Sequence, residues 1–261
     1  MKKLQETTVY IVVTGEKLLI PLSNDSSITM IGVYSLKQEP FYIAQTPLTQ
    51  KQVCALIELI EHKRIRSEIY SNAYKLDNLY DAYKKALEHD GENEQFPVST
   101  LWRYAQHSEI LAILNSLYPQ YEFLTPKIEH LELAARDGCG NEILINHKYS
   151  DHLLPVSNGH STKLCINDIF ENVLSITEDT YKGRFFGDNL AYGTSFHETE
   201  APIGIFYRRI KYSETYDIGY RPIMKKRNTE DDSKETVQTS NDSCDGDYDY
   251  LNYLNTYDTF L

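Results

Sequence analysis

The segment TPKIEHLELAARDG spans residues 125–138 and carries the clearest structural signals in the chain. Thr125 can cap a helix, Pro126 suits the first helical turn, and Gly138 is a typical terminator. The apolar residues that should face inward are spaced three or four apart and comprise Ile128, Leu131 and Ala135. This pattern predicts a short helix with one buried face.

Three more helices are predicted upstream of this segment. The first has Thr49 as its cap, and its inward positions are Val53, Leu56, Ile57 and Ile60. The second carries an apolar stripe and stops near Asp90-Gly91; the stripe comprises Leu76, Leu79, Tyr80, Tyr83 and Leu87. The third runs from a Ser99 cap to about Leu117 through Trp102, Ala105 and Ile110. The first half of the domain is therefore helix-rich.

Short strands are predicted at both ends of this helical part. Those before it are a hairpin of Val9–Val13 with Leu18–Ile20, then Ile28–Val33 and Phe41–Ala44. Helical periodicity disappears after Gly140, and the later strands are Glu142–Ile145, Val173–Ile176, Gly204–Tyr207 and Ile218–Ile223. A helical first half followed by a loop-rich half with short antiparallel strands predicts an α+β fold.

Six segments, in order and covering roughly residues 28 to 224, carry a family resemblance. They are QTPLT with Gln52, FPV leading to Trp102 and Ala105, residues 125–138, Asp168 with Asn172-Val173, Gly193 with Ser195 and Phe196, and IGYR at 218–221. Together they resemble the formylglycine-generating enzyme, or sulfatase-modifying-factor, family. The resemblance implies a C-type-lectin-like domain over residues 1–224, with residues 63–95 as a helical insertion.

The catalytic cysteines of that family have no counterpart here. The resemblance places them just after the Gly193–Phe196 segment, where they hold copper and oxidise a substrate cysteine. Soft thiolates select Cu(I), yet the corresponding positions are Glu198 and Ile203, and residues 166–243 contain no cysteine. The chain is therefore predicted to be a catalytically degenerate member that binds no copper.

The turn that holds calcium in the family is also altered. Asp168 and Asn172 are retained, but Ser175 stands where the family has a glutamate. Because calcium takes six or more oxygen ligands, we do not predict a calcium site, and no cofactor is expected.

Charge and composition narrow the classes of partner. The formal net charge is −12 and the sequence pI is about 5.1, so the surface repels phosphate backbones and nucleic-acid binding is not expected. The basic cluster Lys225–Arg227 is followed at once by acidic residues and is interpreted as a solvated junction. Residues 225–261 are predicted to form a mobile, acidic, tyrosine-rich tail.

No segment has the length and apolarity of a transmembrane helix, and no signal peptide is predicted at the N-terminus. The four cysteines, Cys54, Cys139, Cys165 and Cys244, show no metal-ligand spacing. We therefore predict reduced, structural thiols in a cytoplasmic protein with no membrane partner. Association with a virion is the alternative location.

Candidate binding residues lie in the second half of the chain, near the groove that holds substrate peptide in the family. Tyrosine and arginine anchor interfaces, although packing within a strand is the alternative role for these side chains. The predicted ligand-binding residues are Tyr192, His197, Glu198, Phe206, Tyr207 and Arg208. No catalytic or metal-binding residue is predicted.

Three functions remain open from the sequence. The leading hypothesis is a non-catalytic recognition protein whose loops bind a protein or peptide, as in the variable proteins of diversity-generating retroelements. The second is a metal-dependent oxygenase of the same fold that uses His197 with carboxylates. The third is a structural or assembly component of a particle such as a phage. The oligomeric state is not predicted.

Overall fold

The computed structural model describes residues 15–35, 38–61, 76–101, 104–135, 152–156, 161–162, 164–169, 172–180, 189–193, 207–209 and 217–227. All of them belong to the first of two compact units, residues 1–229. The second unit, residues 230–261, lies outside the described residues. The predicted strands Val9–Val13 and Glu142–Ile145 and the predicted mobile tail also lie outside them, apart from residues 225–227 of the tail.

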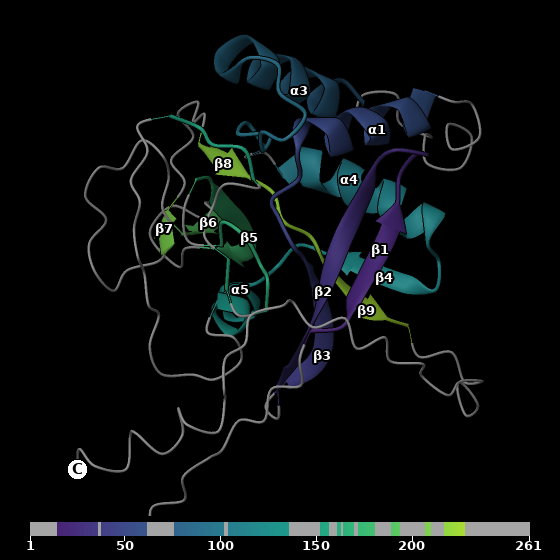
Figure 1. Ribbon diagram of the computed structural model, residues 1–261, viewed down its shortest axis with the longest axis vertical. Coiled ribbons are helices and arrows are strands. Elements are labelled where there is room, and N and C mark those ends of the chain that lie inside the picture. Colours follow the sequence, from purple (N-terminus) through teal and green to yellow (C-terminus); the bar gives the residue numbers. More distant parts are fainter. Residues whose placement is uncertain are drawn as a thin grey trace, which may run out of the picture. The chain divides into compact units, whose positions relative to one another are not determined.

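The larger sheet combines strands from the beginning and the end of the domain's sequence (Figure 1). Its strand order is β1 (Lys17–Pro21), β2 (Ser27–Ser35), β3 (Gln38–Ala44), β9 (Ile223–Lys226) and β4 (Tyr121–Leu124), and every neighbouring pair is antiparallel. Ile31 lies opposite Ile43, and Ile43 lies opposite Ile223. These side chains are fully buried, so an apolar row crosses the sheet and fixes its register.

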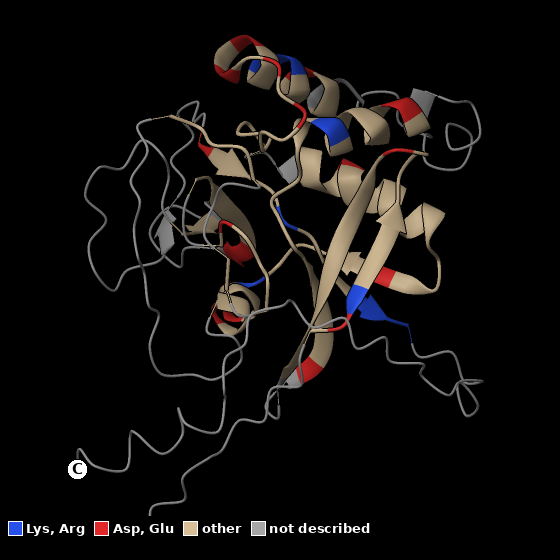
Figure 2. Cartoon of the chain, viewed as in Figure 1, with Lys and Arg blue, Asp and Glu red and all other residues tan. Residues whose placement is uncertain are grey.

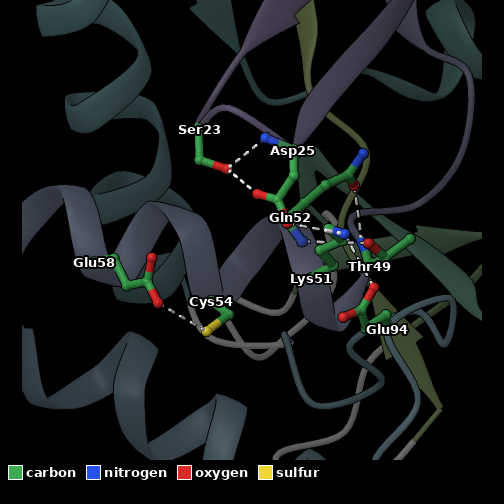
Figure 3. Close-up of polar contacts among 8 residues, drawn as sticks. All are labelled: Ser23, Asp25, Thr49, Lys51, Gln52, Cys54, Glu58 and Glu94. Carbon is green, nitrogen blue, oxygen red and sulfur yellow. Dashed lines mark hydrogen bonds and ion pairs between the residues drawn. The ribbon is translucent and has the colours of Figure 1, made fainter.

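Three helices pack together beside this sheet: α1 (Gln50–Glu61), α3 (Leu76–Asp90) and α4 (Tyr104–Leu117). Their buried faces contribute to one core cluster, with members Val53, Leu56, Ile57, Leu79, Ala82, Ala86, Ile110, Ile113 and Leu114. The helix predicted from Thr49 is confirmed with its cap, since Gln52 N donates to Thr49 Oγ1 (3.3 Å) and Thr49 N donates to Gln52 Oε1 (3.0 Å) (Figure 3). This reciprocal pair is a capping box.

Three details of the predicted helices are wrong. Tyr80 is 42% exposed instead of facing inward, and Lys84 Nζ lies 4.7 Å from its ring centroid. Ser99 does not cap α4, because its hydroxyl donates to Asp90 and the helix starts at Tyr104. Thr125 does not cap the following helix, because its hydroxyl is hydrogen-bonded to the Tyr220 phenol.

That following helix is α5 (Ile128–Ala135), and its N-terminus is capped by Asp179 and by its own His130. Ile128 N donates to Asp179 Oδ2 at 2.6 Å, and Lys127 N donates to His130 Nδ1 at 3.0 Å. Leu131 and Ala135 are buried as predicted. α5 contacts β2 of the larger sheet and two strands of a second sheet.

The second sheet has the order β7 (Tyr207–Arg209), β6 (Asn189–Tyr192), β5 (Leu174–Thr180) and β8 (Ile218–Gly219). Its pairs are antiparallel except β5 with β8, which is parallel. The single strand predicted over Ile218–Ile223 is in fact β8 and β9, one in each sheet. The predicted α+β fold, with helices in the first half and short, mostly antiparallel strands, is confirmed.

Candidate recognition surface at the end of the second sheet

Several chain segments meet at one end of the second sheet. Leu174 pairs with Ile218, where β5 and β8 begin, and Tyr192, the last residue of β6, pairs with Tyr207, the first of β7. Tyr192 also lies opposite Ser175 of β5. We call this the recognition end and define it as residues 172–175, 192–193, 207 and 217–218.

The chain leaves the recognition end through Gly193. This residue has φ +101°, a left-handed conformation that glycine adopts readily and that other residues adopt at a cost in energy. The connection over residues 194–206 leaves β6 there and rejoins the sheet at Tyr207. It therefore has both attachment points at the recognition end.

Arg221 anchors the loops beneath this sheet. Its side chain is fully buried, and it donates three hydrogen bonds to backbone carbonyls: Nη1 to Ala44 O (2.7 Å) and Gln45 O (2.8 Å), and Nη2 to Asn167 O (2.5 Å). These acceptors belong to the end of β3 and to a loop more than 120 residues later. One guanidinium therefore ties the first sheet to the loop that precedes the second.

A second polar contact continues from the same loop. Asn172 Oδ1 accepts from Leu154 N (3.0 Å), and Asn172 Nδ2 donates to Leu154 O (2.9 Å) and to Asp168 Oδ2 (3.3 Å). Asp168 and Asn172 have φ +52° and +71°, and these residue types tolerate that conformation better than most. The turn into β5 is thus held by side-chain hydrogen bonds on both sides.

Arg221 and Asp168 also interact electrostatically. Burial lowers the pKa of the Arg221 guanidinium, and the Asp168 carboxylate raises it. Guanidinium groups remain protonated in proteins at neutral pH, so Arg221 supplies a permanent buried positive charge beside a buried carboxylate. We call Arg221, Asp168 and Asn172 the buried clamp. The sequence indicated these residues through the family resemblance alone, since their contacts arise from tertiary structure.

The structure describes three of the six predicted ligand-binding residues. Tyr192 is fully buried in a core cluster with Ile31, Ile43 and Ile223. Its side chain therefore packs in the interior, which is the alternative role given above for these residues. Tyr207 and Arg208 lie on β7, in register with Tyr192 and Ala191. His197, Glu198 and Phe206, as well as Ile203, lie outside the described residues.

One Ser–Asp–His arrangement occurs elsewhere but lacks the order needed for nucleophilic catalysis. Asp90 lies between the other two groups: it accepts from the Ser99 hydroxyl, and its Oδ1 is 2.7 Å from His89 Nδ1. In a hydrolytic triad the imidazole lies in the middle, because it takes the proton from serine. Ser99 is also fully buried. This cluster joins the end of α3 to the next loop and is structural.

Two of the four cysteines, Cys54 and Cys165, lie in the described ranges. No group of three or more His, Cys, Asp or Glu side chains there is arranged to hold a metal ion. Cys54 is a free thiol, and its Sγ lies 3.9 Å from Glu58 Oε1 (Figure 3). Cys165 is disulfide-bonded, so the prediction that the thiols are reduced is wrong at this position.

Charges of both signs are interleaved at the end of β9, where the basic cluster lies (Figure 2). Lys225 Nζ is 3.1 Å from Glu39 Oε2, and Lys225 lies opposite Glu122 of β4. Lys226 and Arg227 are exposed. The interpretation of this cluster as a solvated junction fits these contacts. In the described part of the chain, no helix is long and apolar enough to cross a membrane.

No protein-family model matches this sequence, and no curated protein matches it. Two solved structures are similar to the chain at low identity. CarF is 14% identical, with a TM-score of 0.48, over 82% of this chain and 97% of CarF. Variable protein 1 of Treponema denticola is 15% identical, with a TM-score of 0.46, over 83% of this chain and 99% of that protein. Membership of the formylglycine-generating enzyme family stays a prediction.

Proposed function

We propose that this protein is a non-catalytic recognition protein that binds a protein or peptide through β7 and the connection over residues 194–206, for which the buried recognition end serves as the platform. The observation that supports it most is the buried clamp. Arg221 donates its hydrogen bonds to the backbone carbonyls of Ala44, Gln45 and Asn167, so these bonds do not depend on the side chains of the connection. A rigid scaffold with attached loops is a common arrangement for binding sites.

The sequence supports the absence of the copper chemistry that the formylglycine-generating enzyme family carries out. The family resemblance places Glu198 and Ile203 at the positions of the paired cysteines, and a carboxylate and an alkyl group cannot replace two soft thiolates as Cu(I) ligands. The residues left for binding are Tyr207 and Arg208 on β7 with His197, Glu198 and Phe206 in the connection. Aromatic and arginine side chains are the types that contribute most to interfaces.

Selection from a phage-displayed library of random 12-residue peptides tests this proposal. Peptides enriched on the full chain are measured for affinity against two variants, Tyr207→Ala and Arg208→Ala. Each has a matched control at an exposed position: Tyr80→Ala on α3 and Arg227→Ala after β9. Far-UV circular dichroism establishes that all four variants fold.

We expect Tyr207→Ala or Arg208→Ala to weaken binding by about tenfold or more, because residues that anchor an interface contribute that much. The controls should stay within about twofold of the wild-type affinity. Enriched peptides that bind all four variants equally, or that lose affinity for Tyr80→Ala or Arg227→Ala instead, would place binding on another surface. That result would refute the proposal.

A further inference from the structure

His107 is a buried histidine with one satisfied nitrogen and one unsatisfied nitrogen. It lies on α4 and is 1% exposed. Nε2 lies 2.6 Å from Leu101 O, and since a carbonyl can only accept, Nε2 carries the proton. Nδ1 is buried and has no hydrogen-bond partner. It is therefore an acceptor lone pair with no donor, and it is the atom that a further proton would occupy.

The imidazole lies at the junction between the helices and the second sheet. Its ring stacks on Tyr220, with centroids 4.5 Å apart and planes at 9°. Leu101, which accepts its hydrogen bond, donates N–H to Ile218 O (2.9 Å). Ile218 N donates to Ser99 O (2.9 Å), and Leu174 N at the start of β5 donates to Asp217 O (2.8 Å). A continuous series of hydrogen bonds thus links His107 to the recognition end.

Among the described residues, no acidic group that could balance a second proton contributes to the electrostatics of His107. The phenol ring of Tyr220 faces it from the β8–β9 connection, and the Leu101 carbonyl faces it from the segment before α4. Glu109 lies two residues further along α4, and its Oε2 accepts from Leu79 N instead. Arg221, next to Tyr220, directs its guanidinium to the three carbonyls described above.

We propose that His107 is an acid-sensitive latch: protonation of Nδ1 opens the contact between α4 and the 99–101 segment and so releases β8 and the start of β5, while the larger sheet stays folded. The charged ring cannot be solvated where it lies, and its new N–H has no acceptor. Attraction to the face of Tyr220 offsets part of this cost. Opening brings the ring into water. The proposal does not rest on the recognition role.

The shift in the pKa of His107 has the direction that the latch requires. Burial lowers the pKa of His107 to about 4, and the bond to Leu101 raises it by less. An exposed histidine titrates near pH 6.5. Between these values the open state binds more protons than the closed state, so closure is complete above about pH 6.5 and weakens as the pH falls toward 4. From pH 7 to pH 5 the opening equilibrium should rise about 20-fold.

Amide hydrogen exchange, corrected for intrinsic rates, tests the latch in the full chain. We expect the Leu101, Ile218 and Leu174 amides to gain about 20-fold in opening between pH 7 and pH 5, while the β2 and β3 amides change by less than about threefold. In His107→Gln, which does not titrate, all these changes should be small. Loss of protection in both sheets together, or an equal response in His107→Gln, would overturn the proposal.

A second measurement covers the case in which His107→Gln does not fold. NMR titration of the His107 ring in the wild-type chain gives its protonation midpoint directly. The latch requires this midpoint to lie well below pH 6.5 and protection at Ile218 to fall steadily between pH 6.5 and that midpoint. A His107 ring that titrates near pH 6.5 without any change in exchange would contradict it.

Discussion

Removal of the buried guanidinium is expected to be the most damaging single substitution among those we consider. Arg221→Met deletes three hydrogen bonds from a charged donor to Ala44, Gln45 and Asn167 carbonyls. Bonds to charged groups contribute roughly 1.5–3 kcal/mol each. Methionine is apolar and flexible enough to fill part of the space, which limits the additional cavity cost.

The net loss is smaller than the sum of the three bonds. Gln45 O keeps a donor, since Asn167 N also bonds to it at 2.8 Å. Asp168 loses its buried positive neighbour, and breaking a buried charge pair costs about 3–5 kcal/mol. Because these contributions overlap, we expect the free energy of unfolding to fall by about 5 kcal/mol. This is a large part of the roughly 5–15 kcal/mol that stabilises a typical domain.

Urea unfolding at pH 7, followed by far-UV circular dichroism, measures this loss. Arg221→Lys keeps the charge but cannot direct one ammonium to three carbonyls as a guanidinium does, so an intermediate loss of about 2–3 kcal/mol is expected. The exposed Arg227 provides the matched control, and Arg227→Ala should change stability by less than about 0.5 kcal/mol. An Arg221→Met protein with the same unfolding midpoint as Arg227→Ala would refute the role of the clamp.

Three further predictions concern backbone geometry and capping. A Cβ on Gly219 would lie 2.7 Å from Val173 Cγ2, so Gly219→Ala should cost about 1–3 kcal/mol; an unchanged melting temperature would contradict the tight contact. Thr49→Ala should cost about 1 kcal/mol in urea unfolding, whereas Thr49→Ser should retain the cap; equal losses would argue against capping. Gly91 has φ +79° and open space around it, so Gly91→Asn should melt at a higher temperature than Gly91→Val; the reverse order would refute the backbone argument.

Much of the fold could be predicted because local pattern and tertiary packing agree. The apolar spacing of residues 53–57 matches the buried face of α1, and Ile28–Val33 lies within β2. The disagreements arise where side chains act over long distances. Serine is a residue type that commonly caps helices, but the Ser99 hydroxyl donates its hydrogen bond to Asp90 instead. Tyr80 fits the apolar stripe of α3, yet Leu79 and Ala82 supply the contact with the core.

The second sheet is harder to predict because its strands other than β5 are short. β6 has four residues and β8 has two, so alternation within each strand is too brief to recognise. Residues 218–223 resemble one strand, but the buried Arg221 lies between β8 and β9, which pair in different sheets. Nothing local to Arg221 indicates that its acceptors lie at Ala44, Gln45 and Asn167. The site residues on β7 were predicted by type, and their role in binding stays a prediction.

A non-catalytic recognition protein, as we propose here, binds its ligand without altering it. In the direct test, the full chain is incubated in air with a selected peptide that contains one cysteine, once with Cu(I) and once with Fe(II). The mass of the recovered peptide is then measured by mass spectrometry. We predict that the peptide keeps its mass and that any background oxidation equals that of peptide and metal alone. A mass change in excess of that background, in which the number of altered peptide molecules exceeds the number of protein molecules, would show catalytic turnover. That result would contradict a non-catalytic binding role.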